Sequence, residues 1–281
     1  TRAKTSPSPA GPKGGALASG VGLLDKKRWR DERLTTQDIK RVKKLTEVKV
    51  VGRTDITPDL LTMWIEKPEG YTFKPGQYCT IGRDGIERAY SIVSAPHEES
   101  LELFVELVPP PIGNLTPKLW ELKPGDSVTI RPRAKGVFVM DPGPPNQLLV
   151  STVTGVVPYV SIIRDYLYHG RQGNGFYVLQ GASYVDEFVY DGEFTRLASE
   201  HPDLITYVPT ISRPTEERNA GWQGETGRVN TIVGRYVEKL GLAPEDTLVY
   251  ACGHPGMIED VKERTLPRGF RVEEERFWKQ D

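Results

Sequence analysis

The feature that most constrains the fold is a change of pattern at the Pro-rich and Gly-rich segment Asp141-Pro142-Gly143-Pro144-Pro145. Before this segment the chain consists of short β-rich runs separated by turn residues. After it, apolar runs alternate with helical stretches. A chain of 281 residues also exceeds the usual size of a single domain. We therefore expect two domains of different class, joined at this linker.

The part from Leu45 to about Asp141 predicts an antiparallel β-barrel, with a domain spanning residues 45–143. Regularly spaced strands with little intervening helix are typical of that architecture. Only one short helix is indicated, at Thr116–Trp120. Six strands are expected, at Glu47–Arg53, Leu60–Glu66, Gln77–Ile81, Ala89–Val93, Leu101–Val108 and Ser127–Arg131.

Residues 144–281 predict a doubly wound parallel sheet of the α/β class. Strand and helix in repetition indicate a parallel sheet that is covered on both faces. The expected strands are Gln147–Thr152, Gly175–Gln180, Ile205–Val208 and Thr247–Ala251, and the expected helices are Tyr159–Tyr168, Glu193–Glu200, Val229–Leu240 and Met257–Thr265.

Charge is unevenly distributed along the chain. Residues 1–44 hold 12 Lys or Arg and 4 Asp or Glu, a net charge of +8, and the remainder has a net charge of −9. The first 22 residues are rich in Pro, Gly, Ser and Ala, which favours a partly flexible, basic extension. The extension could recruit an extra partner or could serve only as a solubilising tail, and we do not expect it to bind nucleic acid.

Several classes of protein are disfavoured by the composition. Cys79 and Cys252 lie far apart without a CxxC companion, and the four histidines lack ligand-like spacing, so we expect no metal site. The stretch from Leu148 to Ile163 is too short and too polar to cross a bilayer. With no secretory signal in view, we expect a cytoplasmic protein without a transmembrane segment.

Two segments of the first domain could bind an anion. Arg88-Ala89-Tyr90-Ser91 offers a cation, a flat ring and a hydroxyl on a predicted strand. The segment from Gly113 to Pro117 leads into the short helix, with Thr116 as the expected N-cap, and a helix N-terminus suits a phosphate. Each segment alone could equally be purely structural.

The second domain carries turns at the predicted carboxyl ends of its strands. Thr152 to Pro158 forms a strand, turn and helix, and Cys252-Gly253-His254-Pro255 repeats that arrangement at the last strand. Nucleotides usually bind at such ends, although any α/β protein makes these turns. Ser212-Arg213 and Arg228 could grip a phosphate, and Cys252 could also be an inert core residue.

In their order, these segments resemble the ferredoxin:NADP(H) reductase superfamily, in particular its bacterial branch, from Leu45 to the end of the chain. The resemblance also rests on Lys123-Pro124-Gly125-Asp126, Gly136-Val137-Phe138 and the terminal Phe277-Trp278. It implies an FAD-dependent oxidoreductase that exchanges a hydride with NADP(H) and single electrons with a ferredoxin or flavodoxin.

The same resemblance implies roles for individual residues. Ser91, Tyr90 and Cys252 would lie at the catalytic centre. FAD would be bound by Arg88, Ala89, Tyr90, Ser91, Gly113, Asn114, Leu115, Thr116, Phe277 and Trp278. NADP(H) would be bound by Thr152, Thr154, Gly155, Ser183, Ser212, Arg213, Arg228, Cys252, Gly253, Pro255 and Met257.

The sequence departs from the family pattern at two positions of the expected nucleotide site. Val153 replaces a Gly, where a branched side chain should crowd the nucleotide or force the turn to move. Ser183 stands where bacterial relatives often carry an Arg. Two alternatives therefore remain open: an NAD(P)H-dependent reductase component of an oxygenase system, and an FAD-binding subunit of a larger redox complex with a degenerate nucleotide site.

Overall fold

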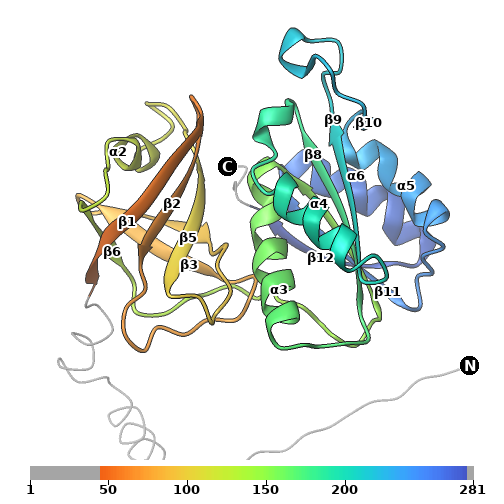
Figure 1. The fold of residues 1–281 in the computed structure, drawn as a ribbon, viewed down its shortest axis with the longest axis horizontal. Helices are drawn as coiled ribbons and strands as arrows, with labels where there is room; N and C mark the ends of the chain where they lie inside the picture. The colour runs from red at the N-terminus through yellow and green to blue at the C-terminus, as the bar shows by residue number, and fades with distance from the viewer. Residues whose placement is uncertain (1–44, 277–281) are drawn as a thin grey trace, which may run out of the picture. The chain divides into compact units, whose positions relative to one another are not determined.

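The computed structural model describes residues 45–276 (Figure 1). The predicted basic extension at residues 1–44 and the terminal aromatics Phe277 and Trp278 lie outside the described residues.

Six antiparallel strands form the first sheet, as the sequence predicts, in the order β4-β3-β6-β1-β2-β5. The end strands β4 and β5 contact each other, which makes the sheet a barrel. Helix α2 (Thr116–Trp120) packs Leu119 into the barrel core. The strands are β1 (Thr46–Thr57), β2 (Leu60–Glu66), β3 (Tyr78–Arg83), β4 (Ile86–Ser91), β5 (Ser100–Glu106) and β6 (Ser127–Ile130).

Strand β5 belongs to two cores because alternate side chains of a strand point to opposite faces. Leu101, Leu103 and Val105 lie in the barrel core. Phe104 lies instead in the core of the α/β half, against helix α3. Glu102 and Glu106 each lie two residues from Phe104 and therefore on the same face of β5. The strand thus presents two carboxylates and an aromatic ring toward the α/β half.

The second sheet is parallel, in the order β10-β9-β8-β7-β11-β12. Its apolar clusters place α3 and α4 on one face and α5 and α6 on the other, which confirms the doubly wound fold (Figure 1). Its strands are β7 (Asn146–Thr152), β8 (Gly175–Ala182), β9 (Ile205–Ile211), β10 (Glu225–Thr226), β11 (Thr247–Gly253) and β12 (Arg271–Arg276). Its α-helices are α3 (Val157–Tyr168), α4 (Asp191–Glu200), α5 (Val229–Lys239) and α6 (Pro255–Thr265), and its 3₁₀ turns are Val153–Val156, Val185–Glu187, Glu217–Asn219 and Leu266–Arg268.

Strand β12 is absent from the sequence prediction. Five of its six residues are charged, so it has no apolar alternation to mark it as a strand. It forms because β11 offers a free edge, with which Arg271 to Arg276 pair in parallel. Polar side chains are acceptable on such an edge strand because one of its sides stays in water.

No helix among residues 45–276 is long and apolar enough to cross a membrane. Cys79 and Cys252 are both free and buried, so no disulfide joins the two sheets within the described residues.

A buried ionic network joins the barrel to the α/β half. Glu102 of β5 is 5% exposed and accepts hydrogen bonds from Arg164 of α3 at 2.9 Å and from the Tyr190 hydroxyl at 3.0 Å. Arg164 also donates twice to Glu193 of α4, at 2.7 and 2.8 Å. The network therefore fixes β5 against α3 and α4.

We predict that Glu102→Ala lowers the free energy of unfolding by about 2 kcal/mol, because it removes one carboxylate from a buried network whose other partners remain. Urea denaturation measures the change. Glu200→Ala is the control: Glu200 forms an exposed pair with Arg196, and its loss should cost less than about 0.5 kcal/mol. Equal losses in the two variants would contradict the importance of the network.

Candidate functional site

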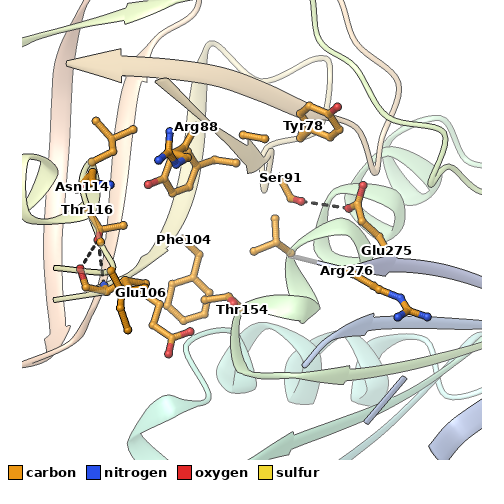
Figure 2. Close-up of a pocket in the computed structure, with 17 residues that line it drawn as sticks. Tyr78, Arg88, Ser91, Phe104, Glu106, Asn114, Thr116, Thr154, Glu275 and Arg276 are labelled. Carbon is orange, nitrogen blue, oxygen red and sulfur yellow. Dashed lines mark hydrogen bonds between the residues drawn. The ribbon is translucent and has the colours of Figure 1, made fainter. Parts of the chain in front are cut away.

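A cavity of about 430 Å³ lies between the barrel and the α/β half (Figure 2). We call it the barrel cavity. Residues of the barrel, the connection after β5, helix α3 and strand β12 line it. They are Tyr78, Arg88, Ala89, Tyr90, Ser91, Phe104, Glu106, Val108, Ile112, Gly113, Asn114, Leu115, Thr116, Thr154, Val157, Glu275 and Arg276.

Every described residue that the sequence predicts for FAD lines this cavity. Strand β4 brings four of them together by pairing with β3, from Tyr78 opposite Ser91 to Arg83 opposite Ile86. Ser91 is buried, whereas Arg88 is exposed and donates to the carbonyl of Glu87 at 2.8 Å. Arg88 forms no salt bridge with any residue between 45 and 276.

The connection after β5 closes one side of the barrel cavity. Gly113 is required there, because a Cβ at this position would overlap the carbonyl of Val108. The predicted N-cap role of Thr116 is wrong: Leu115 is the N-cap and makes no side-chain bond. Thr116 instead donates to the Val108 carbonyl at 2.9 Å and accepts from the Val108 amide at 3.0 Å. The Thr116 hydroxyl can bond to Val108 because β5 has already ended, which leaves the amide and the carbonyl of Val108 without a partner on a neighbouring strand.

Ser91 faces a carboxyl that the sequence does not predict. Its hydroxyl donates to Oε2 of Glu275 on β12 at 3.3 Å, and Figure 2 shows the two side chains pointing toward each other. Burial raises the pKa of Glu275 to about 7, although the Ser91 hydrogen bond lowers it. Near neutral pH the pair can therefore hold or release a proton at the edge of the cavity.

A second cavity, of about 450 Å³, lies at the carboxyl ends of the parallel strands. We call it the sheet-end cavity. Strands β7 and β11 are neighbours there, but the strand that follows β7 lies on one side of this pair and the strand that follows β11 lies on the other. Folds of the α/β class usually bind their ligands where the strand order reverses in this way. Its lining is Glu106, Thr152, Val153, Thr154, Gly181, Ala182, Ser183, Ser212, Arg213, Arg228, Val229, Asn230, Gly253, His254, Gly256 and Met257.

Eight of the residues predicted for NADP(H) line this cavity: Thr152, Thr154, Ser183, Ser212, Arg213, Arg228, Gly253 and Met257. Thr152 and the turn after β11 are tied together, because the His254 amide donates to the Thr152 hydroxyl at 3.0 Å. Gly253 permits this contact because its backbone has a φ of 126°, a value that residues with a side chain rarely adopt.

Three predicted residues do not line either cavity: Gly155, Cys252 and Pro255. The Cys252 side chain lies in the apolar core on the α3 side of the sheet and is 0% exposed. Burial raises the pKa of its thiol well above the usual value. The Cys252 side chain therefore does not reach the sheet-end cavity, because β11 turns it toward the core.

Val153 adopts a left-handed backbone conformation, with a φ of 40°. A branched residue in that region carries strain, which the surroundings must offset. Its side chain packs against buried apolar residues that include Phe188 and Ile211, while the residue still lines the sheet-end cavity. The turn thus keeps a glycine-like conformation without glycine.

The two arginines of the sheet-end cavity have different surroundings. Arg213 donates to the Tyr184 hydroxyl at 2.8 Å and lies 3.4 Å from Glu216. Arg228, in contrast, has no carboxylate partner within the described part of the chain. Buried Asn219 holds the Arg213 loop, since its amide donates to the carbonyls of Ser183 and Arg213 at 2.9 and 2.8 Å.

The two cavities adjoin, because Glu106 and Thr154 line both. Burial, together with the charges of Asp59 and Glu187, raises the pKa of Glu106. Sequence reasoning missed Glu106 and Glu275. The alternation in β5 could have indicated Glu106, whereas Glu275 depends on a strand that the sequence does not mark.

Comparisons with known proteins agree with this geometry. A family model described as an oxidoreductase NAD-binding domain matches residues 149–263. A ferredoxin–NADP reductase of Pseudomonas aeruginosa is 34% identical, over 68% of this chain and 78% of that protein. A flavodoxin/ferredoxin–NADP reductase of Escherichia coli is 30% identical, over 76% of this chain and 87% of that protein.

Other relatives share only part of their length with this chain. One component of the Na⁺-translocating NADH-quinone reductase of Neisseria gonorrhoeae is 33% identical over 66% of this chain. The matched region spans 47% of that component.

Among solved structures, a ferredoxin NADP⁺ reductase from Neisseria gonorrhoeae with bound FAD and NADP has a TM-score of 0.73 at 25% identity. It covers 84% of this chain and 99% of its own.

We predict that the unfolding free energy falls as pH rises through the window from about 4.5 to about 7, because Glu275 binds its proton more tightly when folded. Below pH 4.5 both states are protonated at this group and the contribution is constant. Urea denaturation at pH 5 and pH 8 should show a decrease on the order of 2 kcal/mol that Glu275→Gln abolishes. An unchanged pH dependence in the variant would show that Glu275 ionises normally.

Proposed function

The chain belongs to the ferredoxin–NADP reductase family of oxidoreductases, and from this premise we propose that it binds FAD in the barrel cavity and NADP(H) in the sheet-end cavity. Its reaction would couple hydride exchange with NADP(H) to single-electron exchange with a ferredoxin or flavodoxin.

The observation that carries the proposal is a pair of adjoining cavities, each lined by a guanidinium without a carboxylate partner among residues 45–276. Arg88 lines one and Arg228 the other. An unpaired cation beside a cavity favours an anionic ligand, and guanidinium binds phosphate through paired hydrogen bonds. Two phosphate-bearing ligands that must exchange electrons fit two cavities that share a wall.

The barrel cavity has the chemistry of a flavin dinucleotide site. Arg88 would hold the diphosphate, helped by the backbone amides near Gly113. The ring of Tyr90, which lines the barrel cavity, would stack on the flavin. Phe277 and Trp278, which the sequence predicts as a cover for the ligand, would complete this site.

The sheet-end cavity has the chemistry of a 2′-phosphorylated nucleotide site. Ser212, Arg213 and Arg228 would bind the 2′-phosphate, while Thr152, Thr154 and Gly253 would contact the nicotinamide half. Relatives named for NADP support this preference over NADH. Ser183 would contribute a hydroxyl where an additional cation would bind the phosphate more strongly.

FAD, when bound, supplies a centre that accepts an electron pair and passes single electrons. The chain supplies position and protons. Ser91 and Glu275 line the barrel cavity together, so the pair would be able to give a proton to a flavin bound there or to take one from it. Phe104 and Val157 add apolar surface to the same cavity and would help to exclude water from a bound flavin.

The test is an anaerobic titration of the purified protein with NADPH and then with NADH, followed by flavin absorption. We expect a yellow protein that NADPH reduces more readily than NADH, because only NADPH offers a 2′-phosphate to Arg213 and Arg228. A protein that takes up no FAD on reconstitution would refute the proposal. Equal reduction by the two nucleotides would refute its NADP(H) part.

A second candidate is an FAD-binding subunit of a larger redox complex with a degenerate nucleotide site. The similarity to one component of a multi-subunit reductase favours it, and so does the Val153 side chain, which lines the sheet-end cavity where the family pattern has Gly.

Val153→Gly distinguishes the two candidates. The turn already holds the conformation that glycine would adopt, so we expect the KM for NADPH to change by less than about threefold. The measurement is steady-state reduction of an artificial acceptor. A gain in kcat/KM of tenfold or more, on the order of 1.4 kcal/mol, would favour the degenerate site.

A further inference from the structure

We infer that Glu216 sets the nucleotide selectivity of the sheet-end cavity by competing with the ligand phosphate for Arg213. This inference rests on the proposed function, because it assumes that Arg213 and Arg228 face a 2′-phosphate. It concerns a residue that does not itself line the cavity.

Arg213 is already engaged. Its Nη1 lies 3.4 Å from Oε1 of Glu216 and donates to the Tyr184 hydroxyl at 2.8 Å. The side chains of Arg213 and Glu216 are 52% and 46% exposed, so this pair is weak and exchangeable. A ligand phosphate could therefore displace the carboxylate, against a modest cost.

Glu216 is held in place from three sides. Tyr184 donates its hydroxyl to Oε2 of Glu216 at 2.6 Å. The amide of Glu216 donates to the carbonyl of Arg213 at 3.2 Å, and the amide of Asn219 donates to the carbonyl of Glu216 at 2.9 Å. The backbone of Glu216 is thus held beside Arg213, so the carboxylate stays near the guanidinium even when a phosphate displaces it from direct contact.

The orientation of Tyr184 is fixed in turn. Its ring lies 4.1 Å from the guanidinium of Arg218, which pairs with Asp186 at 2.8 Å. Tyr184 therefore connects Glu216 and Arg213 through its hydroxyl, which accepts from Arg213 and donates to Glu216.

The consequence is a phosphate subsite with two cations and one fixed anion. A 2′-phosphate is attracted by the charges of Arg213 and Arg228 but is repelled at close range by the carboxylate of Glu216. A nucleotide without that phosphate is almost insensitive to Glu216. The carboxylate thus narrows the difference in affinity between phosphorylated and unphosphorylated nucleotides.

The experiment measures binding of 2′-phospho-AMP and of 5′-AMP to the full chain by calorimetry, independently of flavin reduction. Glu216→Gln should tighten 2′-phospho-AMP binding by about fivefold at low salt and leave 5′-AMP unchanged. The gain should shrink at about 0.5 M salt, because a close but exposed charge is screened. A purely structural role of Glu216 would not produce this salt dependence.

Glu200→Gln is the matched control. Glu200 forms an equally exposed pair with Arg196 at 2.6 Å, and it lines neither cavity. This variant should bind both probes like the unmodified protein.

The outcomes separate the two ideas. If the unmodified protein prefers 2′-phospho-AMP but Glu216→Gln binds it equally or less tightly, the selectivity role of Glu216 is wrong and the proposed function stands. If the unmodified protein shows no preference for 2′-phospho-AMP, the proposed phosphate subsite does not exist. The selectivity role of Glu216 then fails together with the NADP(H) part of the proposed function.

Discussion

The structure depends on the ionic network that joins strand β5 to helices α3 and α4. Glu102 is nearly inaccessible to water, so its charge requires Arg164 and the Tyr190 hydroxyl as partners. Arg164 satisfies Glu193 at the same time, which couples a barrel strand to two helices of the parallel sheet. A buried ion pair of this kind adds directional constraints that apolar packing alone does not supply.

Both cavities follow from this junction. Glu106 lies on the same face of β5 as Glu102, and it lines the barrel cavity and the sheet-end cavity together with Thr154. Thr154 belongs to the 3₁₀ turn that begins with Val153. Because β5 is fixed against α3, the short distance between the two binding regions is a property of the fold. For a protein proposed to pass electrons between two ligands, such proximity is the main structural requirement.

Some of the residues predicted for the two ligands owe their position to a short continuous segment, whereas the side-chain contacts of others depend on the tertiary structure. Arg88 to Ser91 and Gly113 to Thr116 each form a continuous segment, and all of them line the barrel cavity. Thr152 ends a predicted strand, Ser212 follows one and Arg228 precedes a predicted helix, and all three line the sheet-end cavity. Cys252 differs because the direction of one side chain on β11 depends on the sheet's two cores. The cap at Thr116 also differs, because its hydroxyl bonds to Val108 across the connection.

The amino-acid sequence by itself determined the two sheets, their class, and the segments that carry the candidate ligand contacts. Strand alternation, turn residues and helix periodicity are local properties that a single segment expresses without its neighbours. Only the tertiary structure decided that charged strand β12 pairs with β11, that Glu275 meets Ser91, and that Glu102 meets Arg164. Burial and neighbouring charge set the energies of these contacts, and both depend on residues that the fold brings together from distant parts of the chain.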